Sequence, residues 1–191
     1  TSMSDFFDDQ DFVSIDFTLQ SFRKGEYDNC TFTDCNFENL HVSNTSFLEC
    51  TFIDCNLANV KFGGTTLNQV TFESCKLLGA DFSVCQPFML DIRFRESILQ
   101  LANFTQLPLK GTSFTSCQVI EVDFTNADLS QATFTGSTLT KTIFDNTNLT
   151  KADFIEALDF TIDTTNNNMK GAMFSKDNLE GLVAHLQLNL K

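Results

Sequence analysis

Large apolar residues recur at every fifth position along most of the chain. The series runs from Phe12 to Phe82, breaks near Pro87, and resumes two residues out of phase from Phe94 to Phe154. An amphipathic helix repeats about every 3.6 residues and a half-buried strand about every 2, so a period of five fits neither element. A fixed period sustained over this length predicts a solenoid built from repeated turns.

Small residues form a second column, two positions before each large one. The other three positions of each unit are mostly polar, so we predict that one large and one small side chain point inward. Four units close one turn, which stacks residues that lie four units apart. The predicted internal ladder contains Phe12, Phe32, Phe52 and Phe72, and continues through Phe94, Phe114, Phe134 and Phe154.

All seven cysteines belong to the small column: Cys30, Cys35, Cys50, Cys55, Cys75, Cys85 and Cys117. Their spacing lacks the C-x₂-C pattern of a zinc site, and the acidic start of the chain does not resemble a secretory signal that would favour disulfides. We interpret them as buried, reduced side chains that pack as small hydrophobes. This interpretation favours a cytoplasmic location.

Three short stretches carry a resemblance to a known family. Ala127-Asp128-Leu129, Ala152-Asp153-Phe154 and Ala80-Asp81-Phe82 resemble the A-[D/N]-L pattern of the pentapeptide repeat family, and the resemblance covers about residues 10–158. It implies an all-β fold, a right-handed quadrilateral β-helix. Residues 1–9 are expected to form an N-terminal segment, whose first two residues we interpret as a cloning remnant.

The segment 84–97 interrupts the repeat and holds the two extra residues. Pro87 falls at a large inward position, where it cannot pack like phenylalanine, so we predict a bulge or small loop on the rod. Arg93 and Arg95 are placed with this bulge. Two interpretations stay open, a tolerated insertion and a contact loop.

Residues 159–191 leave the repeat and are expected to form a turn, a capping α-helix and an apolar tail. Ser175 is a candidate N-cap. The helix is expected to present one apolar face, and the tail a short strand. The cap would bury the end of the solenoid, either in a monomer or as the seam of a two-fold dimer. The residues assigned to this cap or seam are Leu179, Leu182, Val183, Leu186, Leu188 and Leu190.

The net charge of the chain disfavours some classes of binding partner. The chain has 25 acidic and 12 basic residues and a formal net charge of −13. This balance disfavours nucleic acid and anionic membranes, which recruit Lys and Arg, and no apolar run approaches the roughly 20 residues of a membrane span. The two histidines have no nucleophile arranged beside them. We therefore expect a protein without catalytic activity, cofactor or metal.

The order of parts resembles the gyrase-targeting members of the family, of the Qnr and microcin-immunity type. This resemblance implies a dimeric rod that imitates DNA and binds DNA gyrase or topoisomerase IV, with a role in quinolone or toxin resistance. About seven turns spaced by roughly 4.8 Å would make a rod of about 35 Å. The residues predicted to bind the partner are Asp34, Asp54, Glu73 and Glu96, with Arg93 and Arg95 as possible contacts. The alternative is an interaction module with a different partner.

Overall fold

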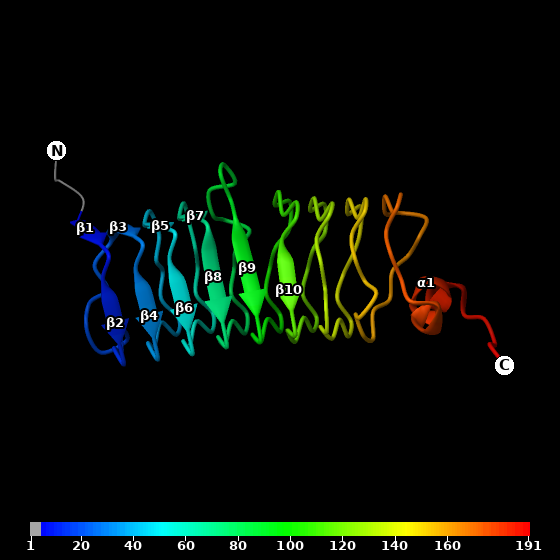
Figure 1. Cartoon of the computed structure of the whole chain (residues 1–191), viewed down its shortest axis with the longest axis horizontal. Coiled ribbons are helices and arrows are strands. Elements are labelled where there is room, and N and C mark those ends of the chain that lie inside the picture. Colours follow the sequence, from blue (N-terminus) through cyan, green and yellow to red (C-terminus); the bar gives the residue numbers. More distant parts are fainter. Residues whose placement is uncertain (1–4) are drawn as a thin grey trace.

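The structure is a computed structural model that describes residues 5–191, and four sides of parallel strands and bridges make up its rod (Figure 1). The first four residues of the predicted N-terminal segment lie outside the described part. One side is a four-stranded sheet of β1 (Asp5–Asp8), β3 (Gly25–Asp28), β5 (Ser46–Leu48) and β7 (Thr66–Asn68), in that order. The next side is a six-stranded sheet of β2 (Asp11–Val13), β4 (Thr31–Thr33), β6 (Thr51–Ile53), β8 (Val70–Glu73), β9 (Ile92–Arg95) and β10 (Ser113–Thr115).

The other two sides are held by single parallel bridges such as Asn36 with Asn56 and Lys61 with Asp81. Sequential strands of one sheet are therefore one full turn apart in the chain. The predicted all-β solenoid is confirmed. The coil also reaches further than the predicted repeat, since β1 begins at Asp5 and the bridges continue to Met173.

Stacked phenylalanine rings fill the core. The rings of Phe12 and Phe32 lie 4.8 Å apart with an interplanar angle of 11°, and the predicted ladder continues with similar spacing to Phe154. It then gains one further ring, Phe174, at 5.1 Å from Phe154. A second ladder joins Phe62, Phe82, Phe104, Phe124 and Phe144. The rings of one ladder meet those of the other edge to face, which favours their mutual packing.

The small inward residues hold neighbouring turns together. All seven cysteines are free and buried, as predicted. Five of the seven thiols, and hydroxyls at equivalent positions, donate to the carbonyl of a large residue in the preceding turn; the five belong to Cys30, Cys35, Cys50, Cys55 and Cys75. Cys55 Sγ contacts the Phe32 oxygen at 3.3 Å, and Ser137 Oγ contacts the Phe114 oxygen at 2.8 Å. This recurring bond explains why Cys, Ser and Thr share a column with Ala.

The chain turns most corners through a left-handed residue placed two positions after the large one. Examples are Asn39, Asp54 and Asn126, with φ of 61°, 53° and 59°. Asn and Asp tolerate this conformation better than other side chains that carry a Cβ, and glycine adopts it freely. The backbone conformation of the corners thus explains part of the preference for outward polar residues. Only the remaining part can reflect binding to a partner.

The predicted bulge is present but shorter than the segment assigned to it. It occupies residues 86–90 and projects from a corner between β7 and β9 (Figure 1). Phe88 and Met89 at its tip are 79% and 58% exposed, while Leu90 packs back against the core. The placement of Arg93 and Arg95 on this bulge is wrong, since both belong to strand β9.

The C-terminal cap differs from the predicted single helix. It consists of a 3₁₀ turn (Lys176–Asn178), α1 (Glu180–Val183) and a second 3₁₀ turn (Ala184–Leu186). Ser175 caps the first turn as predicted, accepting a hydrogen bond from the Asp177 amide. Gln187 ends the second turn at φ 51°, and residues 188–191 form no strand, so the predicted tail strand is wrong.

Gly181 allows the cap to lie close against the coil. A Cβ at this position would lie 2.1 Å from the Phe160 oxygen and 2.7 Å from two Phe160 ring atoms. The backbone therefore lies directly on the last turn of the coil, and the Ile162 amide donates to the Gly181 oxygen at 2.9 Å.

Candidate acidic interface

The four acids predicted to bind a partner lie on the six-stranded sheet and its edge. Asp34, Asp54 and Glu96 occupy the same corner position in different turns, at φ of 53°, 53° and 50°. They share this column with serines. Glu73 is the last residue of β8 and lies in the adjoining column. The structure therefore brings three of the four into one line along the rod, with Glu73 beside it.

Arginines divide these acids into two groups. Arg95 pairs with Glu96 at 3.5 Å, and in the strand register it lies opposite Glu73. Asp34 and Asp54 have no cation within ion-pair distance among residues 5–191. Asp34 accepts a hydrogen bond from Ser14 Oγ at 2.9 Å. The two aspartates thus keep their full charge, while Arg95 partly neutralises the field of the two glutamates.

The acidic surface extends further toward the N-terminal end than the sequence reasoning proposed. Eleven of the 25 acids lie in the first 60 residues, which contain only two basic residues, Arg23 and Lys24. Strands β1 to β6 contain neither Lys nor Arg. We define the acidic surface by seven of the acids on these two adjoining sheets and their corners: Asp8, Asp9, Asp11, Asp28, Asp34, Glu49 and Asp54.

Parallel register places like charges side by side on this surface. Asp8 and Asp28 are Cα partners in β1 and β3, and strands in such a sheet lie about 4.8 Å apart. Like charges directly opposite each other lower the stability of a sheet. Arg23 is bound at 2.9 Å to Asp5, which is in β1 but is not one of these seven acids. The arrangement costs folding free energy and leaves a strong negative field on two sides of the rod.

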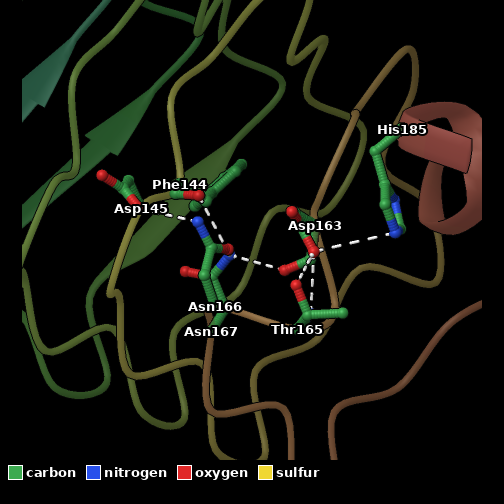
Figure 2. A network of polar contacts seen from close by, with 7 residues as sticks. All are labelled: Phe144, Asp145, Asp163, Thr165, Asn166, Asn167 and His185. Atoms are coloured by element: carbon green, nitrogen blue, oxygen red, sulfur yellow. Dashed lines mark hydrogen bonds and ion pairs between the residues drawn. The ribbon is translucent and has the colours of Figure 1, made fainter.

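A polar network joins the last turn of the coil to the cap (Figure 2). His185 Nε2 lies 3.7 Å from an Asp163 oxygen, and Thr165 donates two hydrogen bonds to the same carboxylate. These bonds, followed by the field of His185, lower the pKa of Asp163 below its usual value. Asn166 and Asn167 bond back to the preceding turn.

The apolar residues predicted to form a cap or dimer seam divide into two groups. Leu182 packs against the core and Val183 is half-buried, which fits the capping role. Leu179, Leu186, Leu188 and Leu190 are 44 to 58% exposed, and Leu158 and Met173 are exposed nearby. The C-terminal end therefore shows a patch of apolar side chains outside the core.

Residues 5–191 contain no group of three or more metal-ligating side chains, and no helix among them has the length and hydropathy needed to span a bilayer. Two shallow grooves are present, of about 470 Å³ under the cap and about 410 Å³ beside Phe17 and Phe22. The molecule presents faces and ends, with a solid core between them.

Comparison with known proteins identifies the repeat. The model described as "Pentapeptide repeat region" matches residues 25–104, and "Pentapeptide repeats (8 copies)" matches residues 117–154, together more than half of the chain. A comparison with curated proteins gives no match.

Solved structures share the fold. A trypsin-treated variant of QnrB1, described as a plasmid-mediated fluoroquinolone resistance protein, is 16% identical with a TM-score of 0.55, over 99% of this chain and 92% of that chain. HetL from the cyanobacterium Nostoc sp. strain PCC 7120, described as involved in heterocyst differentiation regulation, is 11% identical with a TM-score of 0.40, over 91% and 86% of the two chains. At 16% identity the likeness to the QnrB1 variant concerns the fold alone.

Proposed function

Because the chain belongs to the pentapeptide repeat family, we propose that it is a non-enzymatic binding protein that imitates DNA and docks on the basic DNA-binding surface of a type II topoisomerase. The proposed partner is DNA gyrase or topoisomerase IV. The observation that carries the proposal is the acidic surface, whose carboxylates lie on strands β1 to β3 and on the corners, and whose strands contain no basic residue.

Electrostatics supports this partner class. Two pairs of carboxylates, Asp8 with Asp28 and Asp34 with Asp54, belong to adjacent turns about 4.8 Å apart, whereas a duplex carries one charge per about 1.7 Å. The negative electrostatic field of the rod is weaker than that of DNA. In this proposal the rod shape therefore contributes to binding together with the charge. The cost of placing Asp8 beside Asp28 also favours a binding role, since a basic partner would relieve that repulsion.

The biological role in this proposal is protection of the enzyme from a drug or a peptide toxin. QnrB1, whose solved structure shares this fold, is a plasmid-mediated fluoroquinolone resistance protein, which supports testing a quinolone first. Seven free thiols suit a reducing compartment, and we place the interaction in the cytoplasm.

We further propose that the rod dimerises through its C-terminal end. The exposed Leu186, Leu188 and Leu190, with Leu158 and Met173, supply the apolar patch that a two-fold contact needs. Sedimentation of the full chain tests this, and the double variant Leu188→Ser/Leu190→Ser is expected to sediment as a monomer. A wild-type chain that stays monomeric at high micromolar concentration would contradict the dimer.

The decisive experiment is a gyrase supercoiling assay with purified protein, with and without ciprofloxacin. Restored supercoiling in the presence of the drug is expected. The double variant Asp34→Asn/Asp54→Asn is the sharpest probe, because these acids have no ion-pair partner and asparagine keeps the left-handed corner. It is expected to lose the effect.

A matched control removes the same charge elsewhere. Glu121→Gln/Asp159→Asn changes two exposed corner acids toward the C-terminal half and should leave the effect in place. No effect of the wild-type protein at large molar excess would overturn the topoisomerase proposal and favour an interaction module with another partner. Equal loss in both variants would show that net charge, and not the acidic surface, governs binding.

A further inference from the structure

Strand β9 changes the sign of the charge on the outer surface of the six-stranded sheet. It contains Arg93 and Arg95, and no other strand within residues 5–191 contains Lys or Arg. Both side chains point outward and are 54% and 60% exposed. They interrupt a row of hydroxyl side chains at the equivalent outward positions of this sheet: Thr31, Thr33, Thr51, Thr71, Ser113 and Thr115.

Neither arginine is held by a strong ion pair. Arg93 Nη2 lies 3.4 Å from Asp91 Oδ2, and Arg95 Nε lies 3.5 Å from Glu96 Oε1. A guanidinium has several N–H donors, so a single contact at this distance leaves most of them free. Exposed pairs of this kind contribute little to stability. The fold therefore does not explain why two positive charges stand where neighbouring turns mostly hold hydroxyls.

The run of corner acids beside this sheet also ends at β9. The left-handed corners on its two sides hold acids up to that strand: Asp9, Glu49, Asp34, Asp54 and Glu96. At β10 and in the following turn the equivalent corners carry no charge: Gly111, Ser116, Gln131 and Gly136. The acidic surface and the two arginines therefore meet near the middle of the rod, where Figure 1 places β9.

A repeating surface gives a partner no unique position along the rod. A shift by one turn, about 4.8 Å, places Thr31 where Thr51 was and moves a contact from Asp34 to Asp54. A basic surface would then bind in several positions with similar affinity. Selection of one position needs a contact that disfavours the others. Two arginines in the path of a basic surface supply it, because like charges brought together repel.

We propose that Arg93 and Arg95 are specificity-determining residues, which repel the basic surface of the topoisomerase and so fix its position on the N-terminal half of the rod. This role rests on the proposed function and concerns the same acidic surface. The cationic groups of the partner lie against the acids on the N-terminal side of β9 and do not slide past it. The rod then presents one register to the enzyme instead of several.

The test uses the full chain, purified DNA gyrase and a photo-crosslinking p-benzoylphenylalanine in place of Val13, whose side chain is 60% exposed on β2. With both arginines present, the chain is expected to crosslink to one short stretch of gyrase. The double variant Arg93→Thr/Arg95→Thr continues the row of hydroxyls and is expected to crosslink to several stretches. Its affinity for gyrase should stay within about twofold of the wild type or rise, because a repulsion is removed. Its melting temperature should not change.

A matched control removes two positive charges elsewhere. Lys141→Asn/Lys151→Asn changes two exposed left-handed corners and is expected to keep the single crosslinked stretch. The same spread of crosslinks in this control would assign the effect to net charge and overturn the proposal.

Two results with Arg93→Thr/Arg95→Thr would also overturn it. An affinity weaker by about tenfold or more would show that the arginines attract an acidic group of the partner. An unchanged crosslink pattern would show that other residues fix the register. A wild-type chain that neither binds gyrase nor crosslinks to it would overturn the proposed function itself, and this role with it, so the two failures are distinguishable.

Discussion

The rings of Phe72 and Phe94 stack 5.3 Å apart with an interplanar angle of 11°, although the two residues are separated by two more positions than other neighbours in their ladder. They are Cα partners in strands β8 and β9. The coil absorbs the two extra residues in the loop 86–90 and resumes its register before β9 begins. The core is therefore continuous across the break in the sequence pattern.

Because the core is continuous, we expect substitutions in the loop 86–90 to affect the free energy of unfolding much less than substitutions in the ladder. Phe88→Ser is expected to change the free energy of unfolding by less than about 0.5 kcal/mol, because the ring is 79% exposed. Phe94→Ala is expected to cost about 3–5 kcal/mol, because it empties a rung of the ladder. Urea denaturation followed by circular dichroism measures both. A large loss in Phe88→Ser would show that the loop tip packs on the coil.

Two threonines in consecutive turns provide a matched pair. Thr65 Oγ1 donates to the Val42 oxygen at 2.7 Å, whereas the buried Thr45 Oγ1 has no hydrogen-bond partner. Thr65→Val should destabilise the protein by about 1–2 kcal/mol, since it removes a buried hydrogen bond. Thr45→Val should be neutral or stabilising, since it removes an unpaired hydroxyl. Thermal and chemical unfolding of the two variants give the comparison, and equal losses would contradict this account of the column.

The buried thiols predict a loss of stability in alkali. Burial is the main cause that raises the pKa of Cys50 to about 12 and of Cys117 to about 11, from a reference value of 9.0. A raised pKa means that the stabilisation is complete below pH 9.0 and is lost as the pH rises toward 11–12, because the unfolded chain loses its protons first. Unfolding free energies at pH 7.5, 9 and 10 should show this fall.

A Cys50→Ala variant supplies the control for that fall, which should become shallower in it by up to about 1.4 kcal/mol per pH unit. The same burial predicts that a thiol reagent labels no cysteine quickly in the native protein and all seven after denaturation. Rapid native labelling of several cysteines would contradict the closed core.

Glycine substitutions test the docking of the cap. Gly181→Ala places a Cβ against the Phe160 carbonyl and ring, so we expect the cap to detach or shift and the melting temperature to fall by several degrees. Gly63→Ala is the control, because its Cβ would meet only Ser43 Cβ at 3.8 Å and its φ is not left-handed. It should be neutral or slightly stabilising. An unchanged melting temperature in Gly181→Ala would show that the cap adds no stability.

The core could be predicted because it depends on a local rule repeated many times. Each large residue needs only its neighbours one turn away, so Phe12 to Phe72 follow from counting alone. The five-residue spacing shows only that two extra residues lie somewhere in the segment 84–97. The pairing of β9 with β8 shows that the regular coil has resumed by Ile92, which places Arg93 and Arg95 on a strand and not on the loop. The extra rung at Phe174 was missed because residues 161–168 depart from the pattern before it.

The cap and the charged end could not be predicted in the same way. Gly181 reads as a weak helix residue in the sequence, and only its contact with Phe160 shows why glycine is needed there. The acids of β1 and β3 are ordinary polar positions of the repeat until the register places Asp8 beside Asp28. Contacts of this kind depend on which turns are adjacent in space.

Each turn of the coil touches only the turns before and after it. In such a quasi-one-dimensional molecule, local opening begins at the termini and proceeds inward one turn at a time. The amide protons of β8 and β9, near the middle of the rod, are then protected longest from exchange with solvent. The first turn, with one neighbour and half-covered rings, exchanges soonest.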